Sequence, residues 1–482
     1  MSRELFEHYL GDETRLGPAA DGAFTGAAGG AACGDLSRIS LVLDRERVAA
    51  VTFDAEGCGA MKAATAAVAE MVDSVPVLDA ARIGIDEVDA AVGGLTPAKR
   101  HAAQLAADAL HRALASAAAS PERLAPPAGD RVAVAVSGGV DSAVAALLER
   151  ERGAEVVGVT VKLWADPETD GAKACCSPEA VLGARGLAHS LGIPHFTLDL
   201  EEEFRRRVVG GFVSGHAAGN TPNPCILCNG EVRIAAMVDL AGRLGATHLV
   251  TGHYARIVDD GDGPLLAAAA DEAKDQSYML AALPPELLGR LRFPLTELTK
   301  PEVREIAARH GLAVARRPES QDLCFLAGQG KQRFLRRHGG LRDRDGAVLD
   351  RSGRAIGRHG GHHNFTVGQR RGIGVSAAEP LYVLATDAEA NTVTVGTREE
   401  LEARTVRIRN AVLHRDGASV DSVRLRYHSR TVPAAIPTAE TGRHATLEVE
   451  LSEAFAGVSP GQTAVLLAGE AIVGHGTIAA AA

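Results

Sequence analysis

The sequence predicts an α/β chain whose central part is a doubly wound parallel sheet, with an α+β part before it and a small middle part and a β-barrel after it. Three observations lead to this prediction. Apolar runs alternate with helix-like segments from Arg131 onward, which indicates parallel strands joined by helices. An Ala-, Ser- and Pro-rich stretch at 113–130 is typical of a linker. After about residue 380, short strand-like runs with polar turns replace the helical pattern.

The length of 482 residues is too great for one ordinary hydrophobic core, so we expect several domains. The patterns divide the chain into 1–120, a linker at 121–130, and then 131–330, 331–378 and 379–482. No apolar run approaches the length of a membrane span, and the N-terminus lacks the apolar region of a secretory signal. We therefore expect a cytoplasmic protein with no membrane contact.

Charge is distributed unevenly along this acidic chain, whose formal net charge is −10. The segment 331–375 holds 11 Lys and Arg against 3 Asp, so it is strongly basic. A solvated charged face is the ordinary interpretation of such a segment. Contact with a phosphate backbone is the alternative, and it would make a nucleic acid the partner.

A glycine-rich turn joins the strand-like run 132–136 to a helix-like segment at 141–152, and it reads SGGVDS at 137–142. Glycines let backbone N–H groups approach a phosphate, and a helix N-terminus favours an anion. A tight turn capped by Asp or Ser would use the same residue types. The turn lacks the Lys that ends a Walker A loop, so that class of phosphate loop is excluded.

Residues 137–142 resemble the pyrophosphatase-type loop (PP-loop) of ATP-using enzymes that adenylate a substrate and release pyrophosphate. The resemblance implies a nucleotide domain of the PP-loop ATPase type, with ATP and Mg²⁺ as cofactors. The residues that we expect to bind ATP are Ala135, Val136, Ser137, Gly138, Gly139, Val140, Asp141, Ser142, Val161 and Gly252.

Two cysteines follow a proline-stiffened loop, in the segment TPNPCILCN at 221–229. A CxxC pair alone could be redox-active, metal-binding or inert. Together with the PP-loop, it resembles the nucleophile loop of bacterial tRNA 2-thiouridylases. Further segments match that family in order, over about residues 131–482: TGHY at 251–254, KDQSY at 274–278, SQDLCF at 320–325, GQRRG at 368–372, RY at 426–427 and PGQ at 460–462.

The family resemblance implies a reaction in which ATP adenylates the C2 oxygen of a wobble uridine and sulfur then displaces AMP. It implies tRNA as substrate and a sulfur donor, such as a cysteine desulfurase or a sulfur carrier, as partner. Cys228 matches the nucleophile and Cys324 the carrier of persulfide sulfur, and both should act as thiolates. The residues that match tRNA contacts are Asn223, Pro224, Cys225, His253, Lys274, Asp275, Gln276, Arg426, Tyr427 and Gln462. Each of these alone could be an ordinary surface or turn residue.

Cys225 stands where many members of that family have Asp. Three thiolates, from Cys225, Cys228 and Cys324, could hold a four-iron, four-sulfur (4Fe–4S) cluster with one iron open to sulfide. A persulfide relay needs only two of the three cysteines. Both mechanisms stay open at this point. The adjacent pair Cys175 and Cys176 is assigned a structural or incidental role.

Two cysteine motifs near the N-terminus, ACGD at 32–35 and GCGA at 57–60, resemble those of iron–sulfur scaffold proteins of the IscU/NifU type. The third motif of that family ends in His-Cys, but here His101 is followed by Ala102. We therefore expect a degenerate IscU-like set of metal ligands made of Cys33, Asp35, Cys58 and His101. Weakened delivery of metal or sulfur and a purely structural domain are both consistent with this loss.

Two other functions would use part of the same sequence. An amide-forming ligase with a PP-loop would explain the phosphate turn but not the two cysteine contexts. An iron–sulfur or sulfur carrier would explain Cys33 and Cys58 but would leave the phosphate turn without a purpose. AMP release that depends on added tRNA would distinguish all three functions.

Overall fold

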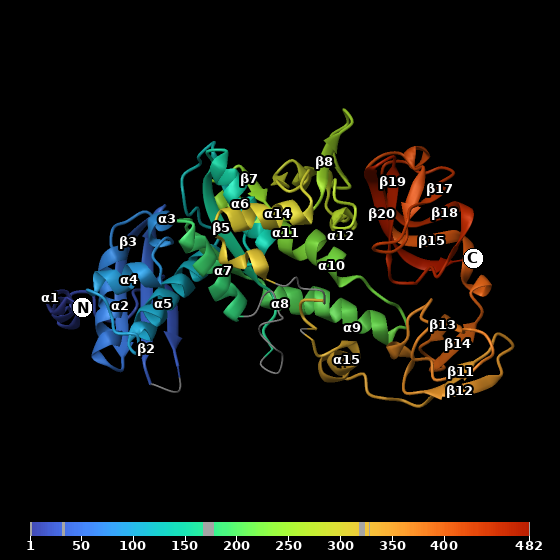
Figure 1. Cartoon of the computed structure of the whole chain (residues 1–482), viewed down its shortest axis with the longest axis horizontal. Coiled ribbons are helices and arrows are strands. Elements are labelled where there is room, and N and C mark those ends of the chain that lie inside the picture. Colours follow the sequence, from blue (N-terminus) through green and yellow to red (C-terminus); the bar gives the residue numbers. More distant parts are fainter. Residues whose placement is uncertain (1, 31–33, 167–177, 318–322, 327, 482) are drawn as a thin grey trace.

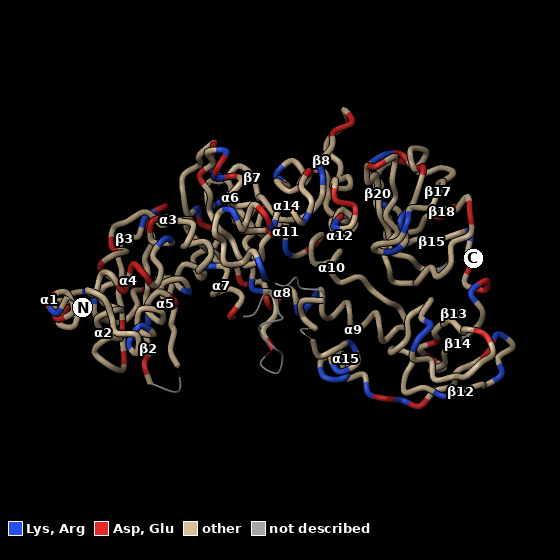
Figure 2. The backbone as a smooth tube through the Cα atoms, viewed as in Figure 1, with Lys and Arg blue, Asp and Glu red and all other residues tan. Residues whose placement is uncertain are grey.

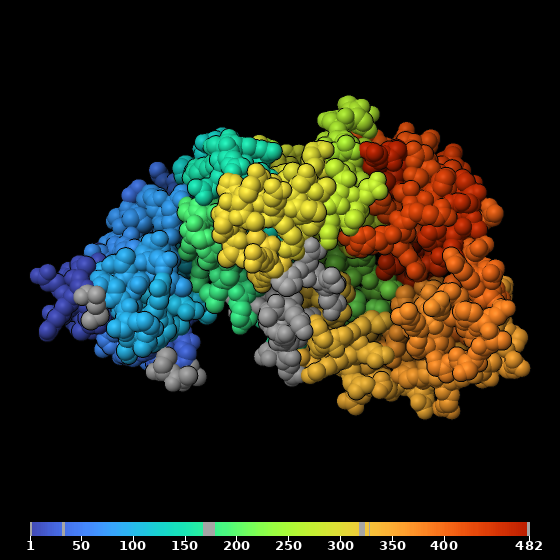
Figure 3. Space-filling model, viewed as in Figure 1, coloured from blue at the N-terminus to red at the C-terminus, as the bar shows by residue number. Residues whose placement is uncertain are grey.

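The structure is a computed structural model that describes residues 2–30, 34–166, 178–317, 323–326 and 328–481. The chain forms an elongated row of parts, with the N-terminal part at one end and the C-terminal barrel at the other (Figure 1). In the space-filling view, neighbouring parts meet along continuous surfaces (Figure 3). Among the described helices, none is both long and apolar enough to cross a membrane.

The N-terminal part is an antiparallel three-stranded sheet covered by helices, as the α+β prediction required. Its strands are β1 (Phe24–Gly29), β2 (Leu36–Asp44) and β3 (Arg47–Glu56). Two Ala-rich helices, α2 (Gly59–Val72) and α5 (Arg100–Ala119), contact each other and the sheet. Small side chains let these helices approach closely, so most of their Ala residues are buried. The remaining helices of this part are α1 (Arg3–Leu10), α3 (Val77–Ala80) and α4 (Ile85–Ala91).

The central part is a five-stranded parallel sheet in the order β10-β7-β4-β5-β6, which confirms the doubly wound prediction. After β4, the chain adds β5 and then β6 on one side of it. It then returns and adds β7 and β10 on the other side, so the direction in which strands are added reverses between β4 and β7. A crevice at such a reversal is where open α/β sheets bind ligands. The bounds are β4 (Arg131–Ala135), β5 (Glu155–Lys162), β6 (His195–Asp199), β7 (His248–Val250) and β10 (Leu291–Arg292), with helices α6 (Val140–Glu151), α7 (Pro178–Ser190), α12 (Ser277–Leu280), α13 (Pro285–Leu288) and α14 (Lys300–Arg309).

Two continuous helices of the central part each contain a π-helical turn. The first consists of α8 (Glu201–Phe204), the π-turn η2 (Arg205–Val209) and α9 (Gly210–Ala217). The second consists of α10 (Pro224–Leu227), the π-turn η3 (Cys228–Arg233) and α11 (Ile234–Arg243). The predicted nucleophile Cys228 is therefore the first residue of a π-turn.

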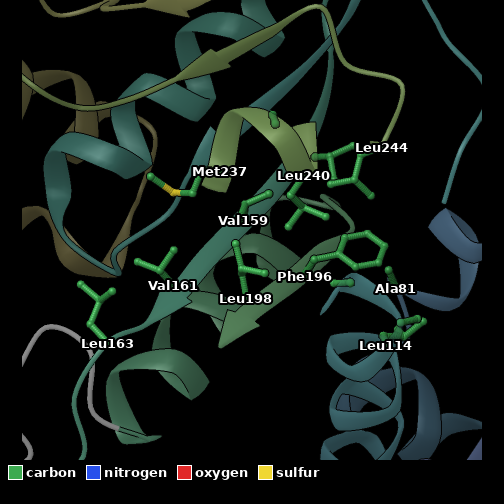
Figure 4. Close-up of a cluster of buried hydrophobic side chains, with 14 of the residues drawn as sticks. Ala81, Leu114, Val159, Val161, Leu163, Phe196, Leu198, Met237, Leu240 and Leu244 are labelled. Atoms are coloured by element: carbon green, nitrogen blue, oxygen red, sulfur yellow. The ribbon is translucent and has the colours of Figure 1, made fainter. Parts of the chain in front are cut away.

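The hydrophobic core runs without a break from the central part into the N-terminal part. Figure 4 shows side chains of β5 and β6 packed against Leu240 of α11 and against Leu244, which follows that helix, with Phe196 reaching towards Leu114 of α5 and Ala81. The edge strand β6 is also covered there, because His195 N–H donates to the carbonyl oxygen of Ala81 at 3.1 Å. The two parts are thus one packed unit.

The middle part corrects the expected boundary between residues 378 and 379. The strands β13 (Tyr382–Asp387) and β14 (Thr392–Gly396) were expected in the barrel, but they form one sheet with β11 (Gly346–Leu349) and β12 (Ala355–His359). The physical reason is a shared core, in which Val383 and Val393 pack with Val348 and Phe365. The helix α15 (Lys331–Gly339) precedes this sheet.

The C-terminal part is a closed six-stranded barrel in the order β15-β18-β17-β16-β19-β20, with β20 pairing back to β15. Closure leaves no free strand edge. A hairpin of the central part, β8 (Arg256–Asp259) and β9 (Pro264–Ala267), extends this sheet because β9 pairs with β20. The barrel strands are β15 (Glu402–Leu413), β16 (Ser422–Arg424), β17 (Val432–Ala435), β18 (Gly442–Ala456), β19 (Thr463–Ala468) and β20 (Ala471–Ala481).

Candidate active site

A cavity of about 200 Å³ opens at the carboxyl ends of β4 and β7, where the strand order reverses. Seven of the ten residues that we expected to bind ATP line it: Ala135, Val136, Ser137, Asp141, Ser142, Val161 and Gly252. The other lining residues are Val159, Thr160, Arg233, Met237, Thr251, His253 and Gln276. The topology therefore gathers residues from five separate segments of the chain into one pocket.

The phosphate loop, which is the segment SGGVDS at 137–142, is held in shape by its own hydroxyl groups. Gly138 has a positive φ of 72°, which a residue with a side chain rarely adopts. Ser142 Oγ accepts from Ser137 N–H at 3.2 Å and donates to the carbonyl oxygen of Gly139 at 3.1 Å. Val140 points away from the cavity into an apolar cluster, because it begins the buried face of α6. Gly138, Gly139 and Val140 thus shape the loop and do not line the cavity.

Gly252 lets two loops approach each other more closely than any side chain would allow. A Cβ atom at this position would lie 2.7 Å from the carbonyl carbon of Asp141 and 2.7 Å from the nitrogen of Ser142. Both neighbours are backbone atoms, so they cannot rotate away. The loop after β7 therefore seals one wall of the pocket directly against the phosphate loop.

Asp141 is held by two residues that the sequence analysis did not single out. Lys300 Nζ lies 2.7 Å from both carboxylate oxygens, and the Tyr254 hydroxyl donates to Oδ1 at 3.1 Å. Lys300 is only 8% exposed, and its Nζ also lies 5.8 Å from the centre of the Tyr254 ring. The carboxylate of Asp141 nevertheless lines the cavity, and a carboxylate oxygen is a ligand that suits Mg²⁺.

The cysteine helix, which is the continuous helix formed by α10, η3 and α11, begins at a side-chain cap. Asn223 Oδ1 accepts from Cys225 N–H at 3.1 Å and from Ile226 N–H at 3.4 Å, which satisfies two free donors of the helix start. Pro224 is buried at the first position of the helix, where its missing N–H costs nothing. Asn223, which we expected to contact the tRNA base, thus uses its oxygen to fix the helix start.

The three candidate cysteines differ in exposure and are not arranged as a metal site. Cys228 is buried at 8% exposure, whereas Cys225 and Cys324 are partly exposed. All three are described, yet within the described ranges no three or more Cys, His, Asp or Glu side chains are placed to hold a metal ion. The observed placement therefore does not fit the 4Fe–4S ligand set considered from the sequence. Cys175 and Cys176 lie outside the described residues.

Arg233, at the end of the π-turn, connects the cysteine helix to the nucleotide cavity. Its Nη2 donates to Asn229 Oδ1 at 2.5 Å and to His253 Nε2 at 3.0 Å, and Nδ1 of His253 lies 2.8 Å from Thr251 Oγ1. Burial, with Arg233 alongside, lowers the pKa of His253 to about 3. His253 is therefore neutral near pH 7, with its proton on Nδ1, because Nε2 accepts from Arg233.

Comparison with known proteins agrees with the observed division of the chain. Family models match a NifU-like N terminal domain at 2–122, a tRNA methyl transferase HUP domain at 130–328, a tRNA methyl transferase PRC-barrel domain at 332–397 and an aminomethyltransferase beta-barrel domain at 400–478. A bifunctional protein NifU/MnmA of Rubrobacter xylanophilus is 46% identical over 94% of this chain and 93% of its own length. The chain belongs to the bifunctional NifU/MnmA family.

Relatives without the N-terminal part match the rest of the chain. The tRNA-specific 2-thiouridylase MnmA of Geobacter metallireducens is 41% identical and covers 73% of this chain and 97% of its own length. The enzyme of the same name from Sorangium cellulosum is 42% identical, over 74% of this chain and 94% of its own length. The NifU/MnmA chain is thus a thiouridylase-like body with a NifU-like domain fused before it.

Several expected tRNA contacts of this NifU/MnmA protein are engaged in contacts between its parts. Asp275 is 6% exposed and accepts from Arg424 Nη1 of the barrel at 2.9 Å. Arg426 Nη2 donates to the carbonyl oxygen of Val367 at 2.7 Å. Lys274 is partly exposed, and Gln276 lines the cavity, where its Oε1 accepts from Tyr254 N–H; Gln462 Nε2 donates to Thr221 O at 2.6 Å.

An aromatic group forms beside the cysteine helix at the barrel junction. The Tyr427 ring lies 5.9 Å from the ring of Tyr278 and 3.8 Å from the ring of His428. Burial raises the pKa of Tyr427, and the nearby Asp275 and Cys225 raise it further. The low aromatic content of the chain did not predict this group, since Tyr278 lies far from Tyr427 and His428 in the sequence.

Three of the four expected ligands in the NifU-like domain come together around Asp35. Cys58 N–H donates to Asp35 Oδ1 at 2.9 Å, Cys58 Sγ lies 3.7 Å from Oδ2, and His101 Nε2 lies 2.9 Å from Oδ2. Burial raises the pKa of Asp35, but the hydrogen bonds from Cys58 and His101 outweigh it and lower the pKa below its ordinary value. Cys33 lies outside the described residues. Ala102, at the missing cysteine position, is fully buried.

The basic segment is less free than its composition indicated. Basic residues gather on α15 in Figure 2, but Arg336 pairs with Asp343 at 2.7 Å and Arg337 pairs with Asp166 at 2.7 Å. Burial lowers the pKa of Lys331 below its ordinary value. Other Lys and Arg residues of the segment, including Arg370 and Arg371 in the GQRRG turn, are exposed.

Proposed function

We propose that this chain is an ATP-dependent tRNA uridine 2-sulfurtransferase that converts the wobble uridine to 2-thiouridine, with release of AMP and pyrophosphate. The observation that carries the proposal is the shared wall of the cavity. The phosphate loop forms one side, and the helix that begins with Asn223 and contains Cys228 contributes Arg233 and Met237 to the other. Cys228 itself does not line the cavity, but its helix forms one wall of it, which supports a nucleotide site next to the sulfur nucleophile.

The chemistry needs two steps because a carbonyl oxygen is a poor leaving group. The uridine O2 attacks the α-phosphorus of ATP and pyrophosphate leaves, so the oxygen becomes part of an AMP leaving group. The outer sulfur of a Cys324 persulfide then attacks C2, and the C2–O bond breaks with its electron pair leaving on AMP. The Cys228 thiolate next attacks Cys324 Sγ, so the S–S bond breaks with its electron pair on the sulfur now bonded to C2, and a Cys228–Cys324 disulfide forms that an external thiol must reduce. We assign Cys228 as the nucleophile and Cys324 as the carrier of persulfide sulfur. Asp141 would hold the Mg²⁺ that arrives with ATP, and that ion neutralises phosphate charge.

The source of the sulfur is part of the proposal. We propose a cytoplasmic cysteine desulfurase or sulfur carrier as donor, with the NifU-like domain as its docking site. Fusion would keep that domain at a high effective concentration beside the catalytic domain. We build no step on a 4Fe–4S cluster, because the placement of Cys225, Cys228 and Cys324 among the described residues does not fit its ligand set; iron and sulfide counts on anaerobically purified protein would test this.

The decisive experiment separates adenylation from sulfur transfer. With a small-molecule persulfide as the sulfur source, Cys228→Ser should lose thiolation but keep tRNA-dependent pyrophosphate release, because the phosphate loop is a separate set of residues. Cys58→Ser, in the NifU-like domain, is the matched control and should keep both activities. Pyrophosphate release without tRNA would favour an amide-forming ligase, and no nucleotide turnover at all would favour a carrier.

A further inference from the structure

The π-turn in the cysteine helix changes which residues share a face. In an α-helix, successive residues turn by about 100°, so residues five apart point roughly 140° away from each other. In a π-turn the hydrogen bonds run from residue i to residue i+5 and a turn takes about 4.4 residues, so residue i+5 lies within about 50° of residue i. The turn η3 spans Cys228–Arg233, so it brings Arg233 onto the face that carries Cys228.

Arg233 is held in place but its charge is not neutralised. Its Nη2 is fixed by Asn229 and by His253, which are both uncharged near pH 7. Its Nε is buried and has no hydrogen-bond partner in the described part of the chain. Within the same described residues, Arg233 forms no ion pair with a carboxylate. A buried N–H without a partner and an unbalanced charge are both costly unless an anion completes the site.

The position of Arg233 indicates which anion that is. Arg233 lines the cavity together with the phosphate-loop residues Ser137 and Asp141. The α-phosphate is the only phosphate of ATP that becomes bonded to the uridine oxygen that sulfur later displaces. A cation on the Cys228 face of the helix and in the nucleotide cavity is therefore suited to the α-phosphate, whereas the helix start at α6 is suited to the pyrophosphate end.

We propose that Arg233 is a catalytic residue that binds the α-phosphate of ATP, an inference that rests on the proposed function. In the first step the bond from uridine O2 to the α-phosphorus forms, and the bond to the bridging oxygen breaks with its electron pair leaving on pyrophosphate. In the second step the C2–O bond breaks with its electron pair leaving on AMP. Arg233 keeps its proton throughout and stabilises the charge that collects on the α-phosphate oxygens.

The test compares Arg233→Ala with variants that keep part of the side chain. Single-turnover pyrophosphate release with tRNA should fall about 100- to 1000-fold in Arg233→Ala, as for loss of one preorganised donor in an active site. Arg233→Lys should recover about tenfold of that loss, since it restores the charge but not the planar donor array. Affinity for a non-hydrolysable ATP analogue should change less than tenfold. Arg233→Gln keeps a donor without the charge and should behave like Arg233→Ala.

The control is Arg206→Ala, in the other π-turn, where the side chain is 66% exposed. It should release pyrophosphate at the wild-type rate. Release in Arg233→Ala within threefold of the wild type would overturn the proposal. So would an equal loss in His253→Ala with no further loss in the double variant, because Arg233 would then act only by positioning His253. Absence of tRNA-dependent pyrophosphate release in the wild type would instead show that the proposed function is wrong.

Discussion

Asp108 and Arg185 form a buried ion pair that should fasten the NifU-like domain to the catalytic domain. Arg185 Nη2 on α7 lies 2.8 Å from Asp108 Oδ1 on α5, and the two side chains are 8% and 15% exposed. Burial lowers the pKa of Arg185, and the Asp108 carboxylate opposes that effect. Asp108→Ala would leave a guanidinium buried without its counterion, which costs about 3 to 5 kcal/mol.

Because the chain contains several cores, a single global unfolding free energy is not the right measure of this change. The His195 amide reports on the interface directly, since it donates to the carbonyl oxygen of Ala81 across it. If domain separation is the opening that exposes this amide, a loss of 3 to 5 kcal/mol raises its hydrogen-exchange rate about 100- to 5000-fold, at 1.36 kcal/mol per tenfold.

The controls use the same carboxylate. Arg112, the other partner of Asp108, is 60% exposed, so Arg112→Ala should cost no more than about 1 kcal/mol. The double variant Asp108→Leu with Arg185→Met should regain most of the protection, because apolar replacement of a buried pair is close to neutral. An exchange rate in Asp108→Ala within tenfold of the wild type would refute the reasoning and show that apolar packing alone holds the interface.

Three further outcomes follow from the geometry. Gly252→Ala should weaken ATP binding at least tenfold in a calorimetric titration, because its Cβ would press on the backbone of Asp141; unchanged affinity would contradict the close approach. Burial first, then nearby cations, lowers the pKa of His216 to about 3, so its stabilising effect is complete above pH 6.5 and is lost as the pH falls towards 3. His216→Leu should therefore flatten, by about 1.4 kcal/mol per pH unit, the decline below pH 6.5 of the local opening free energy that hydrogen exchange of the α9 amides reports, and an unchanged slope would argue against a buried neutral ring. Replacing both Arg370 and Arg371 by Ala should reduce the salt slope of tRNA binding by about 1.4 to 1.8, and an unchanged slope would place the RNA elsewhere.

The nucleotide pocket could be predicted from the sequence because the residues of its phosphate-loop wall follow one another in the chain. A buried strand, a glycine turn and a helix start follow one another in the chain, and local rules connect that pattern to a phosphate site. Gly252 could be found only through the family resemblance, and the structure supplies its physical reason, which is backbone contact with Asp141. Arg233 and Lys300 were missed because the sequence around a single Lys or Arg does not indicate which group its side chain will contact in the folded protein.

The boundary near residue 378 was misplaced for a similar reason. Strand patterns in β13 and β14 look the same whether they pair forward into the barrel or backward onto β11, since period-two alternation does not name a partner. The parallel pairing of Val393 with Val348 decides the matter, and only tertiary packing reveals it. The role of Asn223 was likewise hidden, because an Asn before Pro is suited both to capping a helix and to meeting a base.

The junction at Thr221 suggests how RNA contacts and catalysis can be connected. Thr221 N–H donates to the carbonyl oxygen of Pro460 at 2.8 Å, its carbonyl oxygen accepts from Gln462, and its hydroxyl lies 3.2 Å from Thr366 Oγ1 of the middle part. The barrel and the middle part therefore both form hydrogen bonds with the segment that leads into the cysteine helix. An RNA that shifts either part moves Thr221, and the rigid turn through Pro224 carries that movement to the start of the helix that positions Cys228. Residues expected to touch tRNA can thus act on the nucleophile through the junction that they form.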